Sequence, residues 1–475
     1  MLGSIAQRKG RFGSARKTYS EEMSELDFSQ LDRIAERWVG RTAERSAARD
    51  PLAAAQNVTL RVDRSAERAL RKGHPWLFAD GIRDQSHDGR AGDFAVIFDR
   101  RRNFLALGLY DPESPIRVRI LHHGKPTPVD AAFFARRVQG LAELRAKLFA
   151  DDAGTNAYRL INGENEGMPG LVADRYANTL VVKLYTTAWL PHLRHVVRPL
   201  SRLTGAQRVV LRWSRGATRA LNSLGESELP GELPGELPDE LPDELADGVL
   251  LGGLALDGPV LFWENGLRFE CDPCRGQKTG FFLDQRDNRA RVEALAGGKD
   301  VLNTFAYTGG FSLYAARGGA KSVVSLDASA PALQAAQRNF EHNRAIPGVA
   351  GVHHETLRAD AFRSLAELAA AGRDFDLVVV DPPSFASRQG EVERALGAYA
   401  SLTRLALGVL RPGGDLIFAS CSARITSDDF FACLHAAARR AGRPLREIER
   451  TAHPADHPVG FEQGAYLKCI FAKVP

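Results

Sequence analysis

The sequence lacks any apolar run close to the roughly 18–20 residues that a membrane-spanning helix needs. We therefore expect no membrane partner.

Cysteine is also scarce, with five in 475 residues. An odd, scattered set favours a reducing compartment over a disulfide framework, so we expect a cytoplasmic protein. Cys271 and Cys274 form a lone C-x-x-C pair. No second ligand pair follows at a zinc-site spacing, and nothing else supports a redox role, so we expect no metal.

A strong charge of one sign is absent as well. Lysine and arginine number 63 against 58 acidic residues, which gives a net charge of +5 and a pI near 8.9. This balance permits a polyanionic partner, but a generic basic surface explains it equally well. Hydrophobic residues make up 44% and charged residues 25% of the chain, which is typical of a globular protein.

The first 56 residues predict a flexible tail. Positions 1–20 contain five basic residues and no acid, and no apolar segment follows them as it would in a secretory signal. An organelle transit peptide shares the Arg and Ser bias. We favour a solvated extension that could touch RNA.

Two further regions precede the last one. Residues 57–125 contain short strand-like runs separated by Gly, Asp and Pro, which predicts a small β-barrel. Residues 126–262 mix helical and strand patterns, which predicts an α+β domain. Inside it, residues 226–247 carry an E-L-P-G/D pattern, and proline at every fourth position excludes a regular helix or a central strand. We expect a solvated loop insertion there.

Residues 263–475 predict an α/β domain with a doubly wound parallel sheet. Near-continuous apolar strands at 301–306, 322–327, 376–381 and 415–420 alternate with helical segments. Ligands bind such sheets at the carboxyl ends of the strands. A ligand site is therefore expected among the residues that follow these strands.

Four strand ends carry distinctive residues. The first is a glycine-containing turn, the second and third are acids, and the fourth is a double-proline motif: Phe305, Ala306, Tyr307 and Gly309; Asp327; Asp360 with Ala361; and Asp381, Pro382, Pro383 and Ser384. The turn is not G-x-G-x-x-G, which disfavours a dinucleotide. An acid at the second end can accept both ribose hydroxyls of a nucleoside. Two prolines after a buried strand fix a rigid backbone.

Each of these four signals has a plain structural alternative. The turn could be tight without a ligand, Asp327 could cap a helix, and the double proline could be a stiff strand exit. Taken as an ordered set at successive strand ends, they predict an adenosine-cofactor site beside a clamp for a planar base. The basic and aromatic cluster in the β-barrel has two interpretations of equal weight. It could contact RNA, or it could be a basic loop around a core tryptophan. Its residues are Arg71, Lys72, His74 and Trp76.

From about residue 58 to the C-terminus the chain resembles the ribosomal RNA large subunit methyltransferase I family. The resemblance is carried by these stretches: 73–76, 158–161, 170–176, 277–286 (GQKTGFFLDQR with the preceding glycine), 305–311, 381–385 (DPPSF), 420–422 and 453–458. The tail and the E-L-P repeat lie outside the family pattern. The resemblance implies an N-terminal PUA domain, a central α+β domain and a C-terminal Rossmann-like methyltransferase domain.

The resemblance also implies S-adenosylmethionine as cofactor and 5-methylcytosine in large-subunit ribosomal RNA as product. It identifies further cofactor contacts in the 277–286 stretch: Gln277, Lys278, Thr279, Gly280, Phe281, Asp284 and Arg286. Enzymes of this class add a thiolate to C6 of cytosine. Cys421 ends the strand at 415–420, so we predict it as the nucleophile, although free cysteines are often only buried apolar residues. Asp381 is predicted to orient the base.

Several alternatives stay open. Pro383 and Ser384 are predicted to contact the RNA base, and Ser384 stands where another branch of RNA cytosine methyltransferases has a second cysteine. His453, Asp456 and His457 either line the site or have a structural role. A methyltransferase for another RNA base, or a non-catalytic RNA-binding assembly factor, is the rival function. The oligomeric state is open, with a homodimer as one alternative.

Overall fold

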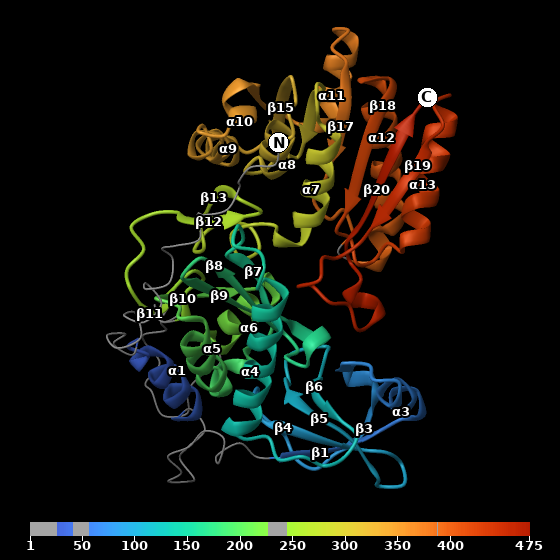
Figure 1. The fold of residues 1–475 in the computed structure, drawn as a ribbon. Coiled ribbons are helices and arrows are strands. Elements are labelled where there is room, and N and C mark those ends of the chain that lie inside the picture. The colour runs from blue at the N-terminus through green and yellow to red at the C-terminus, as the bar shows by residue number, and fades with distance from the viewer. Residues whose placement is uncertain (1–25, 41–56, 227–244, 387) are drawn as a thin grey trace, which may run out of the picture.

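The computed structural model describes residues 26–40, 57–226, 245–386 and 388–475. Most of the predicted tail and of the E-L-P insertion lies outside these residues. The described chain forms three sheets of five or more strands, and Figure 1 shows them one after another along the molecule, with the C-terminal sheet at one end and the β-barrel at the other.

The N-terminal sheet has six strands in the order β2-β6-β5-β4-β1-β3. Their bounds are β1 Asn57–Val62, β2 Trp76–Leu77, β3 Ile82–Gln85, β4 Phe94–Phe98, β5 Phe104–Tyr110 and β6 Val118–His123, with helix α3 at Arg64–Arg71. The alternating burial of β1 follows its sequence, because Val58, Leu60 and Val62 are buried while Asn57 and Thr59 are exposed. This sheet lies where the sequence predicted a small β-barrel.

The central sheet has the order β11-β10-β9-β8-β7. Its strands are β7 Ala157–Asn162, β8 Leu171–Tyr176, β9 Thr179–Leu184, β10 Arg208–Trp213 and β11 Leu250–Gly253, and its helices are α4 Ala131–Leu148, α5 Arg194–Thr204 and α6 Arg215–Glu226. Buried Trp189 and Phe134 belong to its core. Its mixture of parallel and antiparallel pairs agrees with an α+β segment.

Helix α1 (Ser29–Gly40) is a correction to the flexible tail predicted for residues 1–56. Phe28, Leu31 and Ile34 are buried and join the central core, and Ala35 beside them is buried too. Their spacing places them on one face of a helix. The tail prediction gave weight to the mixed charges of this segment and missed the apolar positions between them.

A hairpin, β12 (Val260–Glu264) and β13 (Leu267–Cys271), leads into the C-terminal sheet. That sheet has the order β16-β15-β14-β17-β18-β20-β19. Its strands are β14 Asp300–Thr304, β15 Ser322–Asp327, β16 His353–Arg358, β17 Phe375–Val380, β18 Leu410–Ser420, β19 Arg446–Thr451 and β20 Lys468–Val474. The helices are α7 Arg286–Leu295, α8 Gly310–Arg317, α9 Ala330–His342, α10 Pro347–Gly351, α11 Ala361–Ala370, α12 Val392–Gly408 and α13 Ser427–Arg440.

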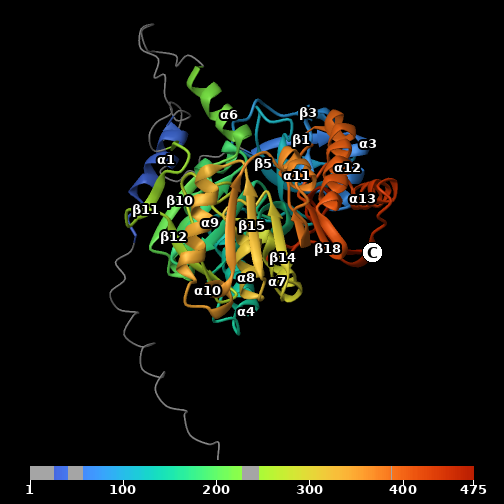
Figure 2. The same cartoon turned by 90° about the horizontal axis from the view of Figure 1, so that it is seen from above.

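Strands β14 to β18 are parallel and β20 is antiparallel to its two neighbours. The chain winds outward from β14 to β16 on one side and then returns to β17 on the other side. The switch point therefore lies between β14 and β17, where a ligand is expected outside the carboxyl ends. Figure 2 shows β15, β14 and β18 side by side, and helices pack on both faces of the sheet, because α8 shares a core with one set of strand residues and α11 and α12 share a core with the alternate set. The doubly wound sheet predicted from the sequence is confirmed, and the edge strands β16 and β19 and the inner strand β20 are additions to it.

Candidate active site

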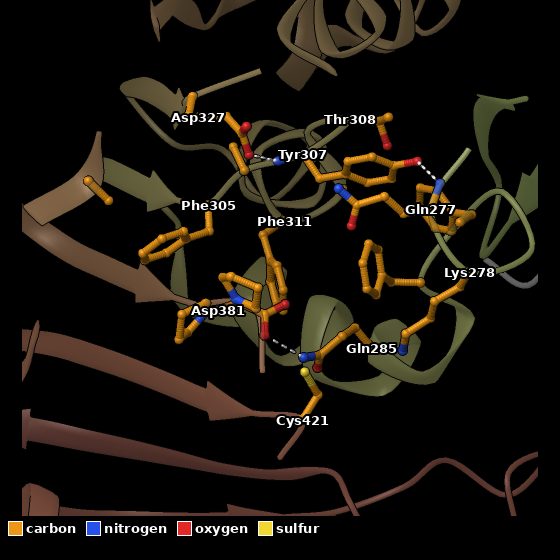
Figure 3. A pocket seen from close by; sticks show the side chains of 18 of the residues that line it. Gln277, Lys278, Gln285, Phe305, Tyr307, Thr308, Phe311, Asp327, Asp381 and Cys421 are labelled. Atoms are coloured by element: carbon orange, nitrogen blue, oxygen red, sulfur yellow. Dashed lines mark hydrogen bonds between the residues drawn. The ribbon is translucent and has the colours of Figure 1, made fainter. Parts of the chain in front are cut away.

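A cavity of about 290 Å³ lies at the predicted strand ends (Figure 3). It is bordered by residues that follow β14, β15, β16, β17 and β18, and by the loop before α7. Of the residues predicted from the sequence, those that line it are Gln277, Lys278, Phe281, Asp284, Phe305, Ala306, Tyr307, Asp327, Asp360, Ala361, Asp381, Pro382, Pro383 and Cys421. Positions separated by up to 144 residues in the chain thus meet at one place.

The turn after β14 has an unusual backbone. Phe305 and Tyr307 have φ of 57° and 49°, a region that non-glycine residues rarely adopt and that recurs at functional sites. The Asp327 carboxylate accepts hydrogen bonds from the backbone N–H of Tyr307 and of Ser329, both at 2.8 Å. Asp327 therefore holds the turn in place and still borders the cavity.

Asp360 has a second role that the sequence also suggested for Asp327. Its side chain accepts a hydrogen bond from the backbone N–H of Arg363 at 3.0 Å and caps helix α11. Ala361 beside it is buried and lines the cavity. Capping uses one carboxylate oxygen, so the other is available to a ligand.

The loop before α7 brings a charged pair into the cavity. Lys278 Nζ lies 2.5 Å from Asp284 Oδ2, which also accepts a hydrogen bond from the Tyr466 hydroxyl at 2.8 Å. Burial alone would raise the pKa of Asp284, but the Lys278 ammonium, together with His457 and Arg159, outweighs burial and lowers it. Asp284 is therefore an anion, and its buried Oδ1 has no hydrogen-bond partner among the described residues.

Four predicted cofactor contacts do not reach the cavity: Thr279, Gly280, Arg286 and Gly309. Thr279 donates to Asp174 at 2.6 Å, and Arg286 binds both carboxylate oxygens of Asp456 at 3.1 and 3.2 Å. At Gly309 a Cβ would approach Ala336 to 2.8 Å. Residues in a motif that closes over a ligand need not all face it, because some hold the loop against the rest of the protein.

Asp381 ends β17 and faces the cavity. Burial and the nearby Asp284 carboxylate raise the pKa of Asp381 to about 7. Its Oδ1 accepts a hydrogen bond from Gln285 Nε2 at 3.0 Å, which Figure 3 shows. The sequence did not single out Gln285, although it lies inside the 277–286 motif. Asn288 donates to the Gln285 side-chain oxygen at 2.6 Å, which fixes the direction of the amide.

Cys421 follows β18 and lines the same cavity as Asp381. It is half-buried, and it is the one cysteine among those that the structure describes that borders the cavity. Burial raises the pKa of its thiol to about 11, while the Lys278 ammonium acts to lower it and the Asp381 and Asp284 carboxylates act to raise it. Ser384 does not line the cavity and instead donates to Ser422 at 3.2 Å.

The basic and aromatic cluster is divided by the structure. Arg71 pairs with Asp99 at 2.9 Å, and Lys72 is exposed. Trp76 is half-buried, donates from Nε1 to Glu164 at 2.9 Å, and packs edge-on against Phe461 with ring centroids 5.1 Å apart. The Trp76 ring thus joins the β-barrel to the central and C-terminal regions. The part of the ring that makes these contacts is not available for stacking on RNA. His74 contacts the Trp76 backbone and ring.

The segment 453–458, which precedes β20 and contains His453 and His457, does not border the cavity. His453 packs edge-on against Tyr466 at 4.4 Å, and His457 contacts the Asp456 carboxylate at 3.1 Å. Neither histidine nor Asp456 lines the cavity. Of their two open roles, the structure favours the structural one. No group of residues suited to a metal ion occurs within the described ranges, and no helix there is long and apolar enough to cross a membrane.

Comparisons with known proteins agree with this arrangement. Residues 249–473 match the sequence family described as S-adenosylmethionine-dependent methyltransferase, and residues 60–123 match the PUA-like domain. A solved methyltransferase structure in complex with SAH has a TM-score of 0.72 and 22% identity, and the match covers 88% of this chain and 100% of that one. At this identity the likeness shows the shared fold.

Curated relatives extend over nearly the whole chain. A ribosomal RNA large subunit methyltransferase of Deinococcus radiodurans is 45% identical over 89% of this chain and 99% of its own length. A ribosomal RNA large subunit methyltransferase I of Shewanella frigidimarina is 36% identical over 88% and 99%. The chain therefore belongs to the family of ribosomal RNA large subunit methyltransferases, and it combines a PUA-like domain with an S-adenosylmethionine-dependent methyltransferase domain.

Proposed function

We propose that the protein methylates C5 of a cytosine in large-subunit ribosomal RNA through a covalent adduct to Cys421. The observation that supports this most directly is that Cys421 and Asp381 border one cavity together with the residues predicted to hold the cofactor. The curated relatives are named for the same class of substrate. We also propose three domains, at residues 57–125, 126–262 and 263–475. We further propose that the protein acts in the cytoplasm and requires no metal. A homodimer stays a prediction.

The cavity fits S-adenosylmethionine by the chemistry of its unpaired atoms. The buried Asp284 Oδ1 and Thr308 Oγ1 have no partner within the described part of the chain, and both residues line the cavity. A carboxylate oxygen suits the ammonium of the methionine part, and Asp327 suits the ribose hydroxyls. Phe305 and Ala361 offer apolar surface to the adenine. When bound, the cofactor supplies an electrophilic methyl group.

Cys421 opens the reaction in this proposal. Its thiol loses a proton, the Sγ electron pair forms a bond to C6, and the C5–C6 π electrons move to C5. C5 would then take the methyl group of bound S-adenosylmethionine, whose sulfur–methyl bond would break with its electron pair staying on sulfur, so that S-adenosylhomocysteine leaves. A base next removes the proton from C5. The freed electron pair restores the C5–C6 double bond, and the Sγ–C6 bond breaks to regenerate the thiolate.

Asp381 orients the base and stabilises charge that develops on the ring. Its carboxyl oxygens can hydrogen-bond around N3 and N4 of cytosine. A pKa near 7 suits this role, because the group can hold or release a proton at neutral pH at little cost. The rigid Pro382–Pro383 backbone fixes where the carboxylate points. Pro383 borders the cavity that the base would enter, and a contact between Ser384 and the base stays a prediction, because Ser384 does not line the cavity.

Delivery of the RNA is assigned to the PUA-like domain. Lys72 and Arg71 offer cations to phosphates, and His74 with part of the Trp76 ring offers a flat surface to a base. A cytosine inside folded RNA must leave its stack to reach a cavity of this kind. We therefore propose that the target base is extruded toward Cys421.

The experiment is mass-spectrometric mapping of 5-methylcytosine after incubation of large-subunit ribosomal RNA with purified protein. We expect Cys421→Ala to lower the rate by more than about 1,000-fold, because the covalent route is lost. Cys433→Ala is the matched control, since Cys433 is half-buried on α13 and does not line the cavity. Its rate should stay within twofold of wild type.

The same experiment separates the rival functions. A methyltransferase acting on guanine or on an exocyclic nitrogen needs no cysteine, so near-normal methylation by Cys421→Ala would refute the C5 mechanism. A non-catalytic assembly factor would bind RNA without binding S-adenosylmethionine. Calorimetry should show that the wild type and Cys421→Ala bind the cofactor with similar affinity.

A further inference from the structure

Lys468 is a buried cation with no part in the catalytic steps proposed above. It begins β20, is 2% exposed, and pairs in register with Ser420, the last residue of β18. The residue after Ser420 is Cys421. Lys468 thus lies on the strand beside the nucleophile although it is 47 positions further along the chain.

The ammonium of Lys468 is held by backbone carbonyls. Its Nζ donates to the carbonyl oxygens of Ser422 at 2.7 Å and Ile425 at 2.5 Å. No carboxylate forms an ion pair with it among the residues that the structure describes. Burying an unpaired ammonium is costly, and an apolar residue would fill the position more cheaply if packing were its only purpose. The next four residues of β20 are buried as well, and none is charged.

The segment around Cys421 is fixed on both sides of the thiol. The hydroxyls of Tyr399 and Ser420 lie 2.8 Å apart, and Ser420 Oγ accepts a hydrogen bond from the Ser422 backbone N–H at 3.2 Å. Ser384 donates to the Ser422 hydroxyl. These contacts are neutral, so Lys468 is the charged member of the group that holds the segment.

We propose that Lys468 is a positioning residue for the nucleophile: its ammonium fixes the carbonyls that follow Cys421 and places positive charge beside the thiolate as it forms. This rests on the proposed function, in which Cys421 must ionise. A nearby cation favours a thiolate over a thiol.

The charges that face Cys421 decide the sign of the effect. Lys278 and Lys468 bring positive charge near it, Asp381 and Asp284 bring negative charge, and the Tyr399 phenol is neutral. Burial lowers the pKa of Lys468 to about 8, and Cys421 acts to raise it. At neutral pH the ammonium therefore predominates, and removing it should make the thiol harder to ionise.

The test follows alkylation of Cys421 by iodoacetamide in the full chain as a function of pH, quantified by peptide mass spectrometry. We expect Lys468→Met to shift the alkylation curve downward below about pH 8, where Lys468 is still an ammonium, and to lower the alkylation rate at pH 7 about tenfold. Above that pH the wild-type lysine is itself neutral, so the two curves should converge. Lys468→Gln keeps donors for the carbonyls and removes the charge, so it should shift the curve in the same direction. Lys468→Arg should restore most of the wild-type curve. Lys473→Met is the matched control, because Lys473 lies at the other end of β20 and pairs with Asp415 at 2.9 Å.

A second readout is the methylation rate on ribosomal RNA. Lys468→Met and Lys468→Gln should lower kcat about tenfold or more while KM for RNA stays within twofold, since the substrate surface is unchanged. The proposal is overturned if the alkylation curve of Lys468→Gln matches wild type, or if Lys473→Met shifts it equally. Alkylation needs no catalysis, so failure here is distinct from failure of the C5 mechanism, which Cys421→Ala reports.

Discussion

At the scale of single residues, the Asp327 carboxylate both holds the turn after β14 and borders the cavity. The two oxygens of Asp327 each accept one backbone hydrogen bond, at Tyr307 and Ser329, and each keeps a further lone pair. Those lone pairs are what a pair of ribose hydroxyls requires. Asp360 likewise has two roles, because it caps α11 and lines the cavity.

Asp327→Asn tests this role. The amide keeps one acceptor oxygen for the backbone but loses the negative charge and one acceptor. We expect S-adenosylmethionine affinity to fall about 10- to 100-fold by calorimetry, the range for a lost charge-assisted hydrogen bond. Asp63→Asn is the control, because Asp63 caps α3 in the β-barrel. Unchanged affinity in Asp327→Asn would remove Asp327 from the cofactor site.

At the scale of elements, helix α1 shows how a charged segment can still dock. Leu31 and Ile34 are 1% and 3% exposed, while Arg33 and Glu36 on the same helix are exposed. Docking of the apolar face supplies the stability, because a helix of 12 residues is marginal by itself in water.

Leu31→Ala should release this helix. A buried leucine truncation costs about 2–5 kcal/mol, which exceeds what a short docked helix can lose without opening. We expect limited proteolysis to cleave within residues 29–40 several-fold faster, while cleavage in β14 to β20 stays unchanged. Glu36→Ala, on the exposed face, should behave as wild type. Equal protection of Leu31→Ala would show that α1 does not depend on this contact.

At the scale of the whole molecule, Asp456 joins the C-terminal region to the central one. Its carboxylate binds the side chain of Arg286 on α7 and accepts from the backbone N–H of Arg159 on β7 at 3.0 Å. Its carbonyl oxygen accepts from Arg145 on α4 at 3.1 Å. Burial would raise the pKa of Asp456, but His457 and Arg286 outweigh it and lower the pKa far below its ordinary value.

The depressed pKa of Asp456 makes the stability of the folded protein depend on pH. Burial lowers the pKa of His457, so at neutral pH it is the Arg286 guanidinium that supplies the charge. Because the folded pKa of Asp456 is depressed, its contribution to stability is complete above the unfolded value of about 3.8 and is lost as pH falls below it.

Asp456→Asn should therefore lower the free energy of unfolding by about 3 kcal/mol at pH 7, the cost of removing one partner of a buried pair. The difference from wild type should narrow below about pH 4, where the Asp456 carboxylate of the unfolded wild-type chain takes up a proton while that of the folded protein stays ionised. Urea denaturation at the two pH values measures both effects. Asp151→Asn, an exposed aspartate of the central region, should cost less than about 0.5 kcal/mol. A penalty for Asp456→Asn that is independent of pH would contradict the charge argument.

The sequence by itself determined the features that are written locally. Apolar strands alternating with helices predict the doubly wound sheet, and glycines, acids and prolines after successive strands mark the cavity, because strand period and turn chemistry depend on near neighbours. The tertiary structure alone decided which of these residues face the cavity and which stand behind it, as Arg286 and Thr279 do.

The tertiary structure also brought together residues that are far apart in the chain and share no local sequence pattern. Gln285 binds Asp381 across 96 positions, and Lys468 holds the carbonyl of Ser422 across 46. The apolar contacts that dock α1 and the packing of Trp76 against Phe461 arise in the same way. Such contacts depend on how strands are ordered in a sheet and how the sheets are joined, and burial then determines the charge state of the groups that meet there.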